Sequence, residues 1–509
     1  MVVTFKGRQF DGETVERGTA LLPPPTPVEI HQFQVLLHHI QAALAEHPQE
    51  PELLSIHFEF PLVDLLAFWE VLSTPSAPYA YWEQPHPALR SLAMGQVVNI
   101  QTRGAERFAQ GQRELQRWQR SMLRVSASGA PLHSTPQWLA SFTFFDDFDP
   151  TPPGQETSAL FAKPFAPGWI WLPRWQICRW PDRCELWIHC QLSAPARFEP
   201  GNALEQEVRS AWDLFQQLKA LLPQGSTSFP LPTPCFSPLS PPAIHLDRFG
   251  EGVEAVLKAM QGGALQKVVL AHNLEVQAKK PFQVRQSLHN LRYYYPDCYL
   301  FCWGTPQGAH FMGASPERLL RLTQRQLQTE ALAGSAPRGS TSQESQGFAQ
   351  RLLANPKERH EHQLVVDFII DQLQALGISP QRSGLPKVRQ LSHIQHLHTG
   401  ITAALTPWLH PLEVLAQLHP TPAVAGVPRA LACNYIRQYE PYDRSLYAAP
   451  LGWIDGSGNC EFVVGIRSAI LYHDRARLMA GAGIVQGSVP QREIAEVKLK
   501  LQTMLRSLA

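Results

Sequence analysis

The sequence predicts a globular protein that combines α-helices with β-strands. Helices are predicted where apolar residues recur at helical spacing, as in residues 364–369 and 494–501. Strands are predicted from short apolar segments at 138–146, 168–172 and 185–193. The chain has 509 residues, of which 44% are hydrophobic and 17% charged, so it has the composition of a protein with a large buried core.

A change of composition divides the chain into three parts. The N-terminal region, residues 1–222, is expected to contain a helix at 28–47 and a second, charged helix near 105–125. Residues 223–246 are rich in Pro and Ser, and we expect them to form an extended linker. The C-terminal region, residues 247–509, carries the motifs that indicate chemistry.

Two acidic pairs are the main chemical signal of the C-terminal region. Glu358 and Glu361 are three residues apart in one predicted helix, and Glu493 and Glu496 have the same spacing in another. Carboxylates at this spacing share one helix face. Either each pair is a solvated helix surface, or the four carboxylates gather around a hard divalent cation such as Mg²⁺.

The sequence around the second acidic pair favours a ligand site. Gly481 and Gly483 lie near the end of a predicted strand, where a ligand can approach bare backbone. Ser488 is predicted to cap the following helix, with Pro490 in its first turn. Amides at a helix start favour an anion, so a bound carboxylate beside a cation is expected here.

The C-terminal region resembles the chorismate-utilising enzymes, which include isochorismate, anthranilate, aminodeoxychorismate and salicylate synthases. The resemblance rests on ordered motifs. They are QKVVLAH (266–272), FMGASPERLL (311–320), TEALAGSAPRG (329–339), KERHEHQLVVD (357–367), HLHTGI (396–401), LHPTPAVAGVPR (418–429), GIRSAI (465–470) and GAGIVQGSVPQREIAEVKLK (481–500).

The resemblance implies an α+β fold, in which antiparallel β-sheets form a core with flanking helices. It also implies that the N-terminal region packs on a chorismate-binding catalytic domain. The expected cofactor is Mg²⁺, held by Glu361 and Glu496, with Glu358 and Glu493 assisting.

Two residues match the catalytic base and acid of the family. Lys267 corresponds to the lysine that activates water, and its place in an apolar strand favours the neutral amine that a base requires. Glu317 corresponds to the acid that protonates the departing C4 hydroxyl of chorismate. Considered alone, Lys267 could be a surface lysine and Glu317 a partner of Arg318 or Arg321.

The resemblance also implies a substrate-binding set. Arg467 and the backbone at Gly481 and Gly483 match the site for the enolpyruvyl carboxylate, for which a guanidinium is well suited. Lys500 matches a lysine near the metal, although by spacing alone it would pair with Glu496. The remaining members are Ser335, His396, Ala423 and Tyr447.

Ala423 is the residue that best separates the reactions of the family. It lies in HPTPAVAGVP, where ammonia-using enzymes and salicylate synthases usually have threonine. Together with Lys267, it favours water as the nucleophile and therefore an isochorismate synthase. Salicylate synthase and anthranilate synthase remain alternatives of the same class, and an inactive chorismate-binding protein is the alternative of a different class.

Composition excludes several other function classes. A formal net charge of +1 without a basic, aromatic-rich stretch argues against nucleic-acid binding. The sequence contains neither a long apolar segment nor a signal peptide, so we expect a cytoplasmic protein without a membrane partner. No glutamine amidotransferase partner is expected, because water is the nucleophile. The product would supply menaquinone, phylloquinone, siderophore or salicylate synthesis.

Overall fold

The structure, a computed structural model, describes most of the chain. The described residues are 26–47, 50–70, 72, 77–86, 88–146, 161, 164–192, 203–222, 246–392 and 394–509. Of the predicted linker, residues 223–245 lie outside this part, and the three-part division of the chain stays a prediction.

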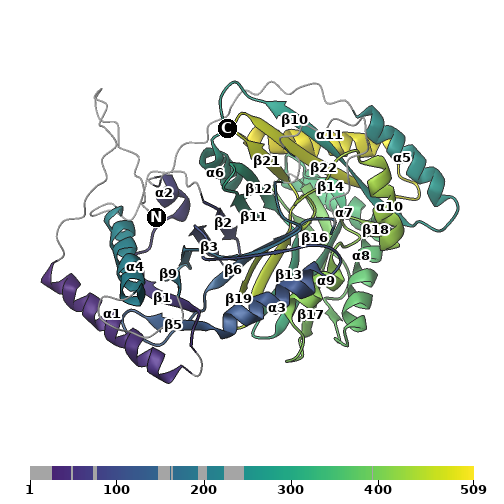
Figure 1. The fold of residues 1–509 in the computed structure, drawn as a ribbon. Helices are drawn as coiled ribbons and strands as arrows, with labels where there is room; N and C mark the ends of the chain where they lie inside the picture. Colours follow the sequence, from purple (N-terminus) through teal and green to yellow (C-terminus); the bar gives the residue numbers. More distant parts are fainter. Residues whose placement is uncertain are drawn as a thin grey trace.

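Twelve of the described strands form one large sheet (Figure 1). Neighbouring strands pair antiparallel, except that β1 and β5 are parallel. In spatial order the strands are β18 (Gly426–Val427), β10 (Lys267–Gln277), β22 (Arg475–Val485), β21 (Ser468–Tyr472), β12 (Ala309–Ser315), β11 (Tyr299–Gly304), β2 (Tyr79–Gln84), β3 (Leu89–Met94), β8 (Trp175–Arg179), β9 (Cys184–Gln191), β1 (Leu53–Glu59) and β5 (Met122–Ser126).

The other described strands form a second, antiparallel sheet. Nine of its ten strands follow the order β15 (Gln381–Arg382), β17 (Ile394–Ala404), β14 (Gln326–Pro337), β13 (Arg318–Thr323), β20 (Cys460–Val464), β19 (Pro450–Asp455), β6 (Gln137–Phe142), β7 (Gly168–Leu172) and β4 (Val98–Thr102), and the tenth, β16 (Lys387–Gln390), also pairs with β17. The first residues of β14 and the last residues of β17 alternate buried and more exposed positions, as expected for a sheet with one face on the core.

Both sheets contain strands from both ends of the chain. In the first, β11 pairs with β2, and in the second, β19 pairs with β6. Hydrogen bonds therefore join the N-terminal strands to the C-terminal ones within each sheet. The N-terminal region completes the same core that supports the C-terminal motifs, as Figure 1 shows by colour.

Helices flank the two sheets. They are α1 (Pro27–Glu46), α2 (Leu65–Glu70), α3 (Arg107–Arg120), α4 (Ala203–Ala220), α5 (Asp247–Met260), α6 (Val284–Tyr294), α7 (Ser342–Ala354), α8 (Pro356–Ala375), α9 (Pro411–Leu418), α10 (Arg429–Tyr439) and α11 (Pro490–Ser507). The two helices that carry the acidic pairs, α8 and α11, both contact β22. This arrangement confirms the predicted α+β fold class.

Three local predictions need correction. The helix predicted near 105–125 ends at Arg120, and β5 starts at Met122, because Met122, Leu123 and Val125 pack into the core as a strand beside β1. The strand predicted at 138–146 ends at Phe142. The residue that caps α11 is Val489, one position after the predicted Ser488, whose hydroxyl instead accepts a hydrogen bond from the Val485 amide at 3.2 Å.

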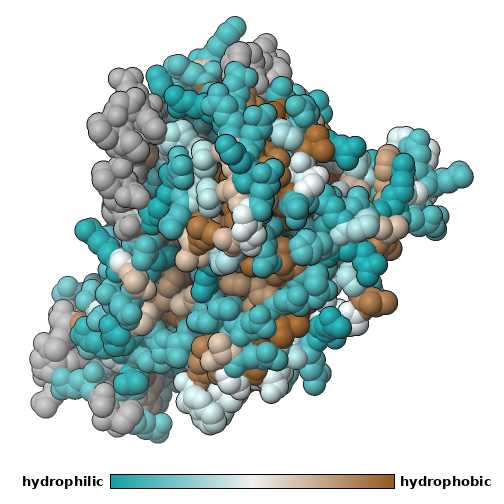
Figure 2. Space-filling model, turned by 90° about the vertical axis from the view of Figure 1, so that its right-hand side faces the viewer, coloured by the Kyte–Doolittle hydropathy of each residue, from teal (hydrophilic) through white to brown (hydrophobic). Residues whose placement is uncertain are grey.

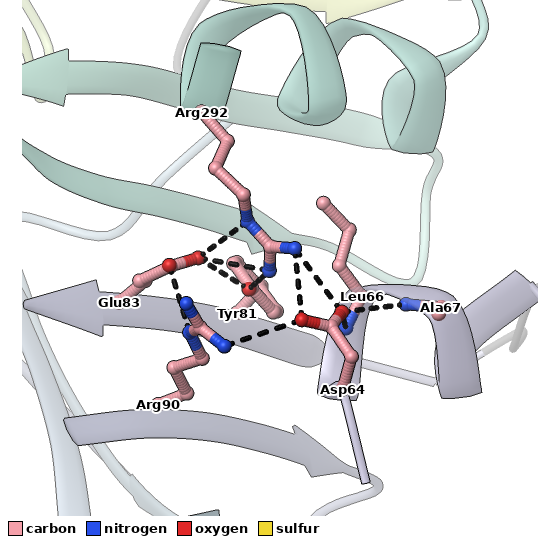
Figure 3. Close-up of polar contacts among 7 residues, drawn as sticks. All are labelled: Asp64, Leu66, Ala67, Tyr81, Glu83, Arg90 and Arg292. Atoms are coloured by element: carbon pink, nitrogen blue, oxygen red, sulfur yellow. Dashed lines mark hydrogen bonds and ion pairs between the residues drawn. The ribbon is translucent and has the colours of Figure 1, made fainter. Parts of the chain in front are cut away.

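A cluster of charged side chains ties α6 to β2 and β3 (Figure 3). We name it the β2–α6 cluster, and it consists of Asp64, Tyr81, Glu83, Arg90 and Arg292. Arg292 of α6 pairs with Asp64 at 2.9 Å and with Glu83 at 2.9 Å. The cluster therefore links a C-terminal helix to N-terminal strands by ionic contacts as well as by the sheet.

Figure 2 shows one face that is mostly hydrophilic, with hydrophobic residues gathered toward its middle. Among the described helices, none has the length and apolar character needed to cross a membrane.

Candidate active site

One pocket brings together most of the predicted site residues. It lies where β10, β14, β22 and α11 meet the segment between α10 and β19. Among the residues that line it are eleven of the predicted fourteen: Glu317, Ser335, Glu361, His396, Ala423, Tyr447, Arg467, Gly481, Gly483, Glu496 and Lys500. The other three, Lys267, Glu358 and Glu493, lie next to lining residues, as described below.

Glu317 is a buried carboxyl at the pocket wall. It follows β12, and its backbone amide donates to the Ser315 hydroxyl at 3.2 Å, which fixes the turn. Burial, and after it the neighbouring Glu330, raise the pKa of Glu317 to about 8. At neutral pH the carboxyl is therefore protonated, as a general acid must be.

Lys267, the predicted base, lies at the start of β10 and is 1% exposed. Its ammonium Nζ lies 2.9 Å from Oε1 of Glu361, a pocket-lining carboxylate on α8. The burial expected from the Val-Val-Leu sequence is thus present, and the lysine is no surface residue. The predicted base and a predicted metal ligand form one buried ion pair.

Gly483 makes this ion pair possible. It lies on β22 directly opposite Val269 of β10. A Cβ atom at this position would lie 2.4 Å from Oε1 of Glu361 and 3.3 Å from Cε of Lys267. Only a residue without a side chain leaves room for both, so the sequence signal at Gly483 has a packing reason.

The two outer carboxylates, Glu358 and Glu493, share one lysine. The ammonium of Lys357 lies 3.1 Å from Glu493 and 3.7 Å from Glu358. Burial raises the pKa of both carboxyls, and the charges of Glu361 and Glu496 add to this at Glu358. The four carboxylates are thus within electrostatic reach of each other, and Lys357 is a neighbour that sequence reasoning did not identify.

A bulge in β14 shapes the wall near Glu358. The register with β17 shifts between Ala333 and Ser335, where Gly334 has a φ of +74°. This conformation favours glycine. The bulge turns the Ser335 amide toward Oε2 of Glu358, to which it donates at 3.0 Å.

His396 is neutral and has a defined orientation. Burial, and then the positive charge of Arg467, lower the pKa of His396 to about 3. Its Nε2 lies 3.4 Å from a guanidinium nitrogen of Arg467, which can only donate, so Nε2 accepts. The proton is therefore on Nδ1, which lies 3.2 Å from the Gly334 carbonyl oxygen.

Arg467 has no acidic partner among the described residues. Its guanidinium also lies 3.9 Å from the Cys298 thiol and 6.0 Å from the centre of the Tyr295 ring. The guanidinium lines the pocket, so its charge is available to an anionic ligand.

Lys500 lies on α11, one helical turn after Glu496. Its ammonium lies 2.7 Å from Glu496 and donates to the Gly481 carbonyl oxygen at 2.8 Å. The intrahelical pair that spacing alone predicts is therefore present, and Lys500 also lines the pocket. Lys500, Arg467 and Arg444 are the cationic side chains among the residues that line the pocket.

The donor set fits a magnesium ion that is completed by water or substrate. Within the described residues, no three side chains of His, Cys, Asp or Glu already converge as ligands. However, Mg²⁺ commonly binds through one or two carboxylates and keeps several waters. Glu361 of α8 and Glu496 of α11 both line the pocket, and their carboxylates are hard oxygen donors.

Ala423 lies in the pocket wall next to a residue that the sequence reasoning missed. Arg444, which is fully buried, lines the same pocket and donates to the carbonyl oxygen of Val424 at 2.8 Å. An arginine in YDRSLYAAP carries no local signal of burial, because its partners come from distant segments. Tyr447 also lines the pocket, and its backbone amide donates to the Arg444 carbonyl oxygen at 2.8 Å.

The matching family model and similar known proteins indicate the same family. The model of the family described as chorismate binding enzyme matches residues 38–509. The salicylate biosynthesis isochorismate synthase of Pseudomonas aeruginosa is 35% identical over 471 residues, covering 91% of this chain and 92% of that protein. The isochorismate synthase DhbC of Bacillus subtilis is 34% identical over 274 residues, covering 52% of this chain and 69% of that protein.

Solved structures agree with this result. MenF, the menaquinone-specific isochorismate synthase from Escherichia coli, has a TM-score of 0.70 at 27% identity, covering 93% of this chain and all 100% of that chain. Anthranilate synthase component I from Streptococcus pneumoniae has a TM-score of 0.62 at 20% identity, covering 82% of this chain and 92% of that chain. The second likeness shows the shared fold alone.

Proposed function

The chain belongs to the family of chorismate-binding enzymes, and from that premise we propose that it converts chorismate to isochorismate with a magnesium ion as cofactor. The isochorismate synthases among its relatives support this reaction. The observation that carries the proposal is the pocket, where a protonated Glu317 and a Lys267–Glu361 pair lie beside Arg467, a cation with no acidic partner among the described residues.

Binding would use the two carboxylates of chorismate. The enolpyruvyl carboxylate would pair with Arg467, whose guanidinium His396 holds in place through Nε2. The backbone at Gly481 and Gly483 would let the ligand approach β22 closely. The ring carboxylate would then lie toward Glu361 and Glu496, where the cation is expected.

The reaction exchanges one hydroxyl for another. A water oxygen would bond to C2 of the ring while its proton passes to the free amine of Lys267. The ring double bonds shift, the C4–O bond breaks, and Glu317 gives its proton to the departing hydroxyl, which leaves as water. Oxygen and hydrogen balance, so the product is an isomer of the substrate.

Lys267 must present a free amine before it can accept a proton. In the structure it pairs with Glu361 at 2.9 Å, so this pair has to loosen or lose its proton first. When bound, Mg²⁺ would supply positive charge that anchors the ring carboxylate and stabilises charge developing during displacement. A Glu361 turned toward the cation would hold Lys267 less strongly, which couples cofactor binding to the base.

Other products are alternatives for the same pocket. Salicylate synthase would add elimination of pyruvate, and anthranilate synthase would use ammonia. Ala423, which lines the pocket without a hydroxyl, supports the reaction with water. Supply of menaquinone synthesis is the route named for one relative and salicylate synthesis the route named for another. Phylloquinone and siderophore synthesis, the cytoplasmic location and the absence of an amidotransferase partner stay predictions.

Product analysis tests the proposal. Purified protein is incubated with chorismate and Mg²⁺, with and without ammonium, and the products are separated by chromatography. We expect isochorismate alone. Salicylate with pyruvate, or anthranilate in the presence of ammonium, would replace the proposed reaction, and no turnover would support a chorismate-binding protein without activity.

A further inference from the structure

Arg444 and Glu440 form an ion pair beneath the pocket. The pair lies just after α10, and the exposed fraction of the Arg444 side chain is 0% and that of Glu440 is 2%. Nε of Arg444 donates to Oε2 of Glu440 at 2.8 Å, and Nη2 donates to Oε1. This is a bidentate contact between a guanidinium and a carboxylate, the geometry that arginine favours.

The same guanidinium holds two segments that are far apart in sequence. It donates to the carbonyl oxygens of Val424 and Val269, each at 2.8 Å. Val424 follows Ala423, and Val269 lies two residues after Lys267 on β10. Glu440 adds a bond of its own, because its Oε1 accepts from the Ala271 amide at 2.8 Å.

A direct role in binding substrate is the competing interpretation, because Arg444 lines the pocket. Four of the five N–H groups of its guanidinium already donate to protein acceptors. Its charge is matched by Glu440 at bonding distance, whereas Arg467 has no acidic partner among the described residues. A substrate carboxylate would therefore find a free cation at Arg467 and a fully engaged one at Arg444.

We propose that Arg444, held by Glu440, is a positioning residue that sets the distance between Lys267 on β10 and Ala423 in the neighbouring loop. The inference rests on the proposed function, since it concerns the position of the proposed base relative to Ala423, the pocket residue that supports the reaction with water. Val269 strengthens the connection, because its amide donates to the Ala425 carbonyl oxygen at 2.7 Å. Arg444 thus connects three segments by hydrogen bonds: the loop that contains Ala423, the strand β10, and the end of α10.

Arg444→Lys is the first test of this role. Lysine keeps the charge but lacks the planar group that bonds to Glu440, Val424 and Val269 at once. Since a misplacement of about 1 Å can cost about 10²-fold in rate, we expect kcat to fall about 10²-fold. KM should change by less than about threefold, because Arg467 and Lys500 still face the substrate. Glu440→Gln, which retains one acceptor oxygen, should lower kcat in the same direction.

Arg477→Lys is the matched control. Arg477 is 2% exposed and pairs with Glu275 at 2.6 Å, across the same two strands, β22 and β10. It is not among the residues that line the pocket. The control should lose thermal stability as Arg444→Lys does but keep the wild-type kcat per folded molecule.

Amide hydrogen exchange gives a readout that does not depend on turnover. In Arg444→Lys and Glu440→Gln, the amides of Val269 and Ala271 should exchange faster, and in Arg477→Lys they should not. Wild-type kcat and wild-type exchange in both test variants would overturn the positioning role, as would an equal loss of kcat in the control. A wild-type protein that does not turn over chorismate would refute the proposed function, and the exchange measurement would still decide the role of Arg444.

Discussion

The β2–α6 cluster and the active site both consist of buried and half-buried charged side chains, but they differ in whether each charge has a partner within the protein. In the β2–α6 cluster, Arg292 contacts Asp64, Glu83 and the hydroxyl of Tyr81 (Figure 3). Asp64 also accepts from the amides of Leu66 and Ala67. Each acidic group there has partners within the cluster.

The active site leaves part of its charge available to a ligand. Arg467 has no acidic partner among the described residues, and Glu317 lines the pocket with a raised pKa. Burial acts on both sites, but its outcome depends on the neighbours. At Asp64 burial would raise the pKa, whereas Arg292 and hydrogen bonds outweigh it and lower the pKa. Charged groups that are paired with each other contribute to the fold, whereas charged groups without a partner are available to bind a substrate.

The largest expected effect is a loss of activity that distinguishes the active site from the β2–α6 cluster. Lys267→Met removes the proposed base, so kcat should fall about 10³-fold, within the range for general acid–base catalysis. The free energy of unfolding should change little, since Glu361 still faces the pocket. Steady-state kinetics and denaturant unfolding measure the two quantities. Lys498→Met, on an exposed position of α11, is the control, and a base role is excluded if both variants turn over chorismate equally.

The opposite pattern is expected in the β2–α6 cluster. Arg292→Met removes one of the two arginines that Asp64 and Glu83 share and leaves them with Arg90 alone, so the free energy of unfolding should fall by about 2 kcal/mol. The kcat of the folded fraction should stay at the wild-type value. Denaturant unfolding with kinetics on the same samples provides the check.

Arg209→Met is the control for that stability measurement. Arg209 pairs with Glu205 on α4 and is 57% exposed, so its loss should cost less than about 1 kcal/mol. If Arg292→Met were as mild as the control, the β2–α6 cluster would not stabilise the fold.

Measuring Mg²⁺ binding tests whether Glu361 of the active site is available to a ligand. Glu361→Gln keeps the shape of the side chain but removes the charge that a cation needs, so the Kd for Mg²⁺ should rise by about 10²-fold. Isothermal titration calorimetry with Mg²⁺ alone measures this without turnover. Glu254→Gln, on the exposed side of α5, should bind as the wild type does. An unchanged Kd in Glu361→Gln would remove Glu361 from the ligand set.

The smallest expected effect is a pH dependence. Glu317 has a pKa of about 8, so it carries its proton below that pH and loses it above. Because only the protonated form can donate to the leaving hydroxyl, kcat/KM should fall by about tenfold per pH unit above pH 8. His396, with a pKa of about 3, stays neutral over this range and should not contribute. A kcat/KM that stays constant up to pH 10 would contradict the role of Glu317 as the acid.

The sequence determined the features that depend on near neighbours. The apolar spacing in 364–369 and 494–501 predicted two helices, and both are present as α8 and α11. The spacing of Glu358 and Glu361 put both on the face that is turned toward the site. Ordered motifs also identified the family, and with it the fold class and eleven of the residues that line the pocket.

Tertiary structure decided what depends on partners distant in sequence. The pairing of β10 with β22 and the contact of α8 with β22 bring Lys267, Gly483 and Glu361 together. Lys357 and Arg444 acquire their roles only because separate segments meet around them. Helical periodicity is a local property that a short window of sequence reveals, whereas strand pairing and the pairing of buried charges follow from how the whole chain excludes water.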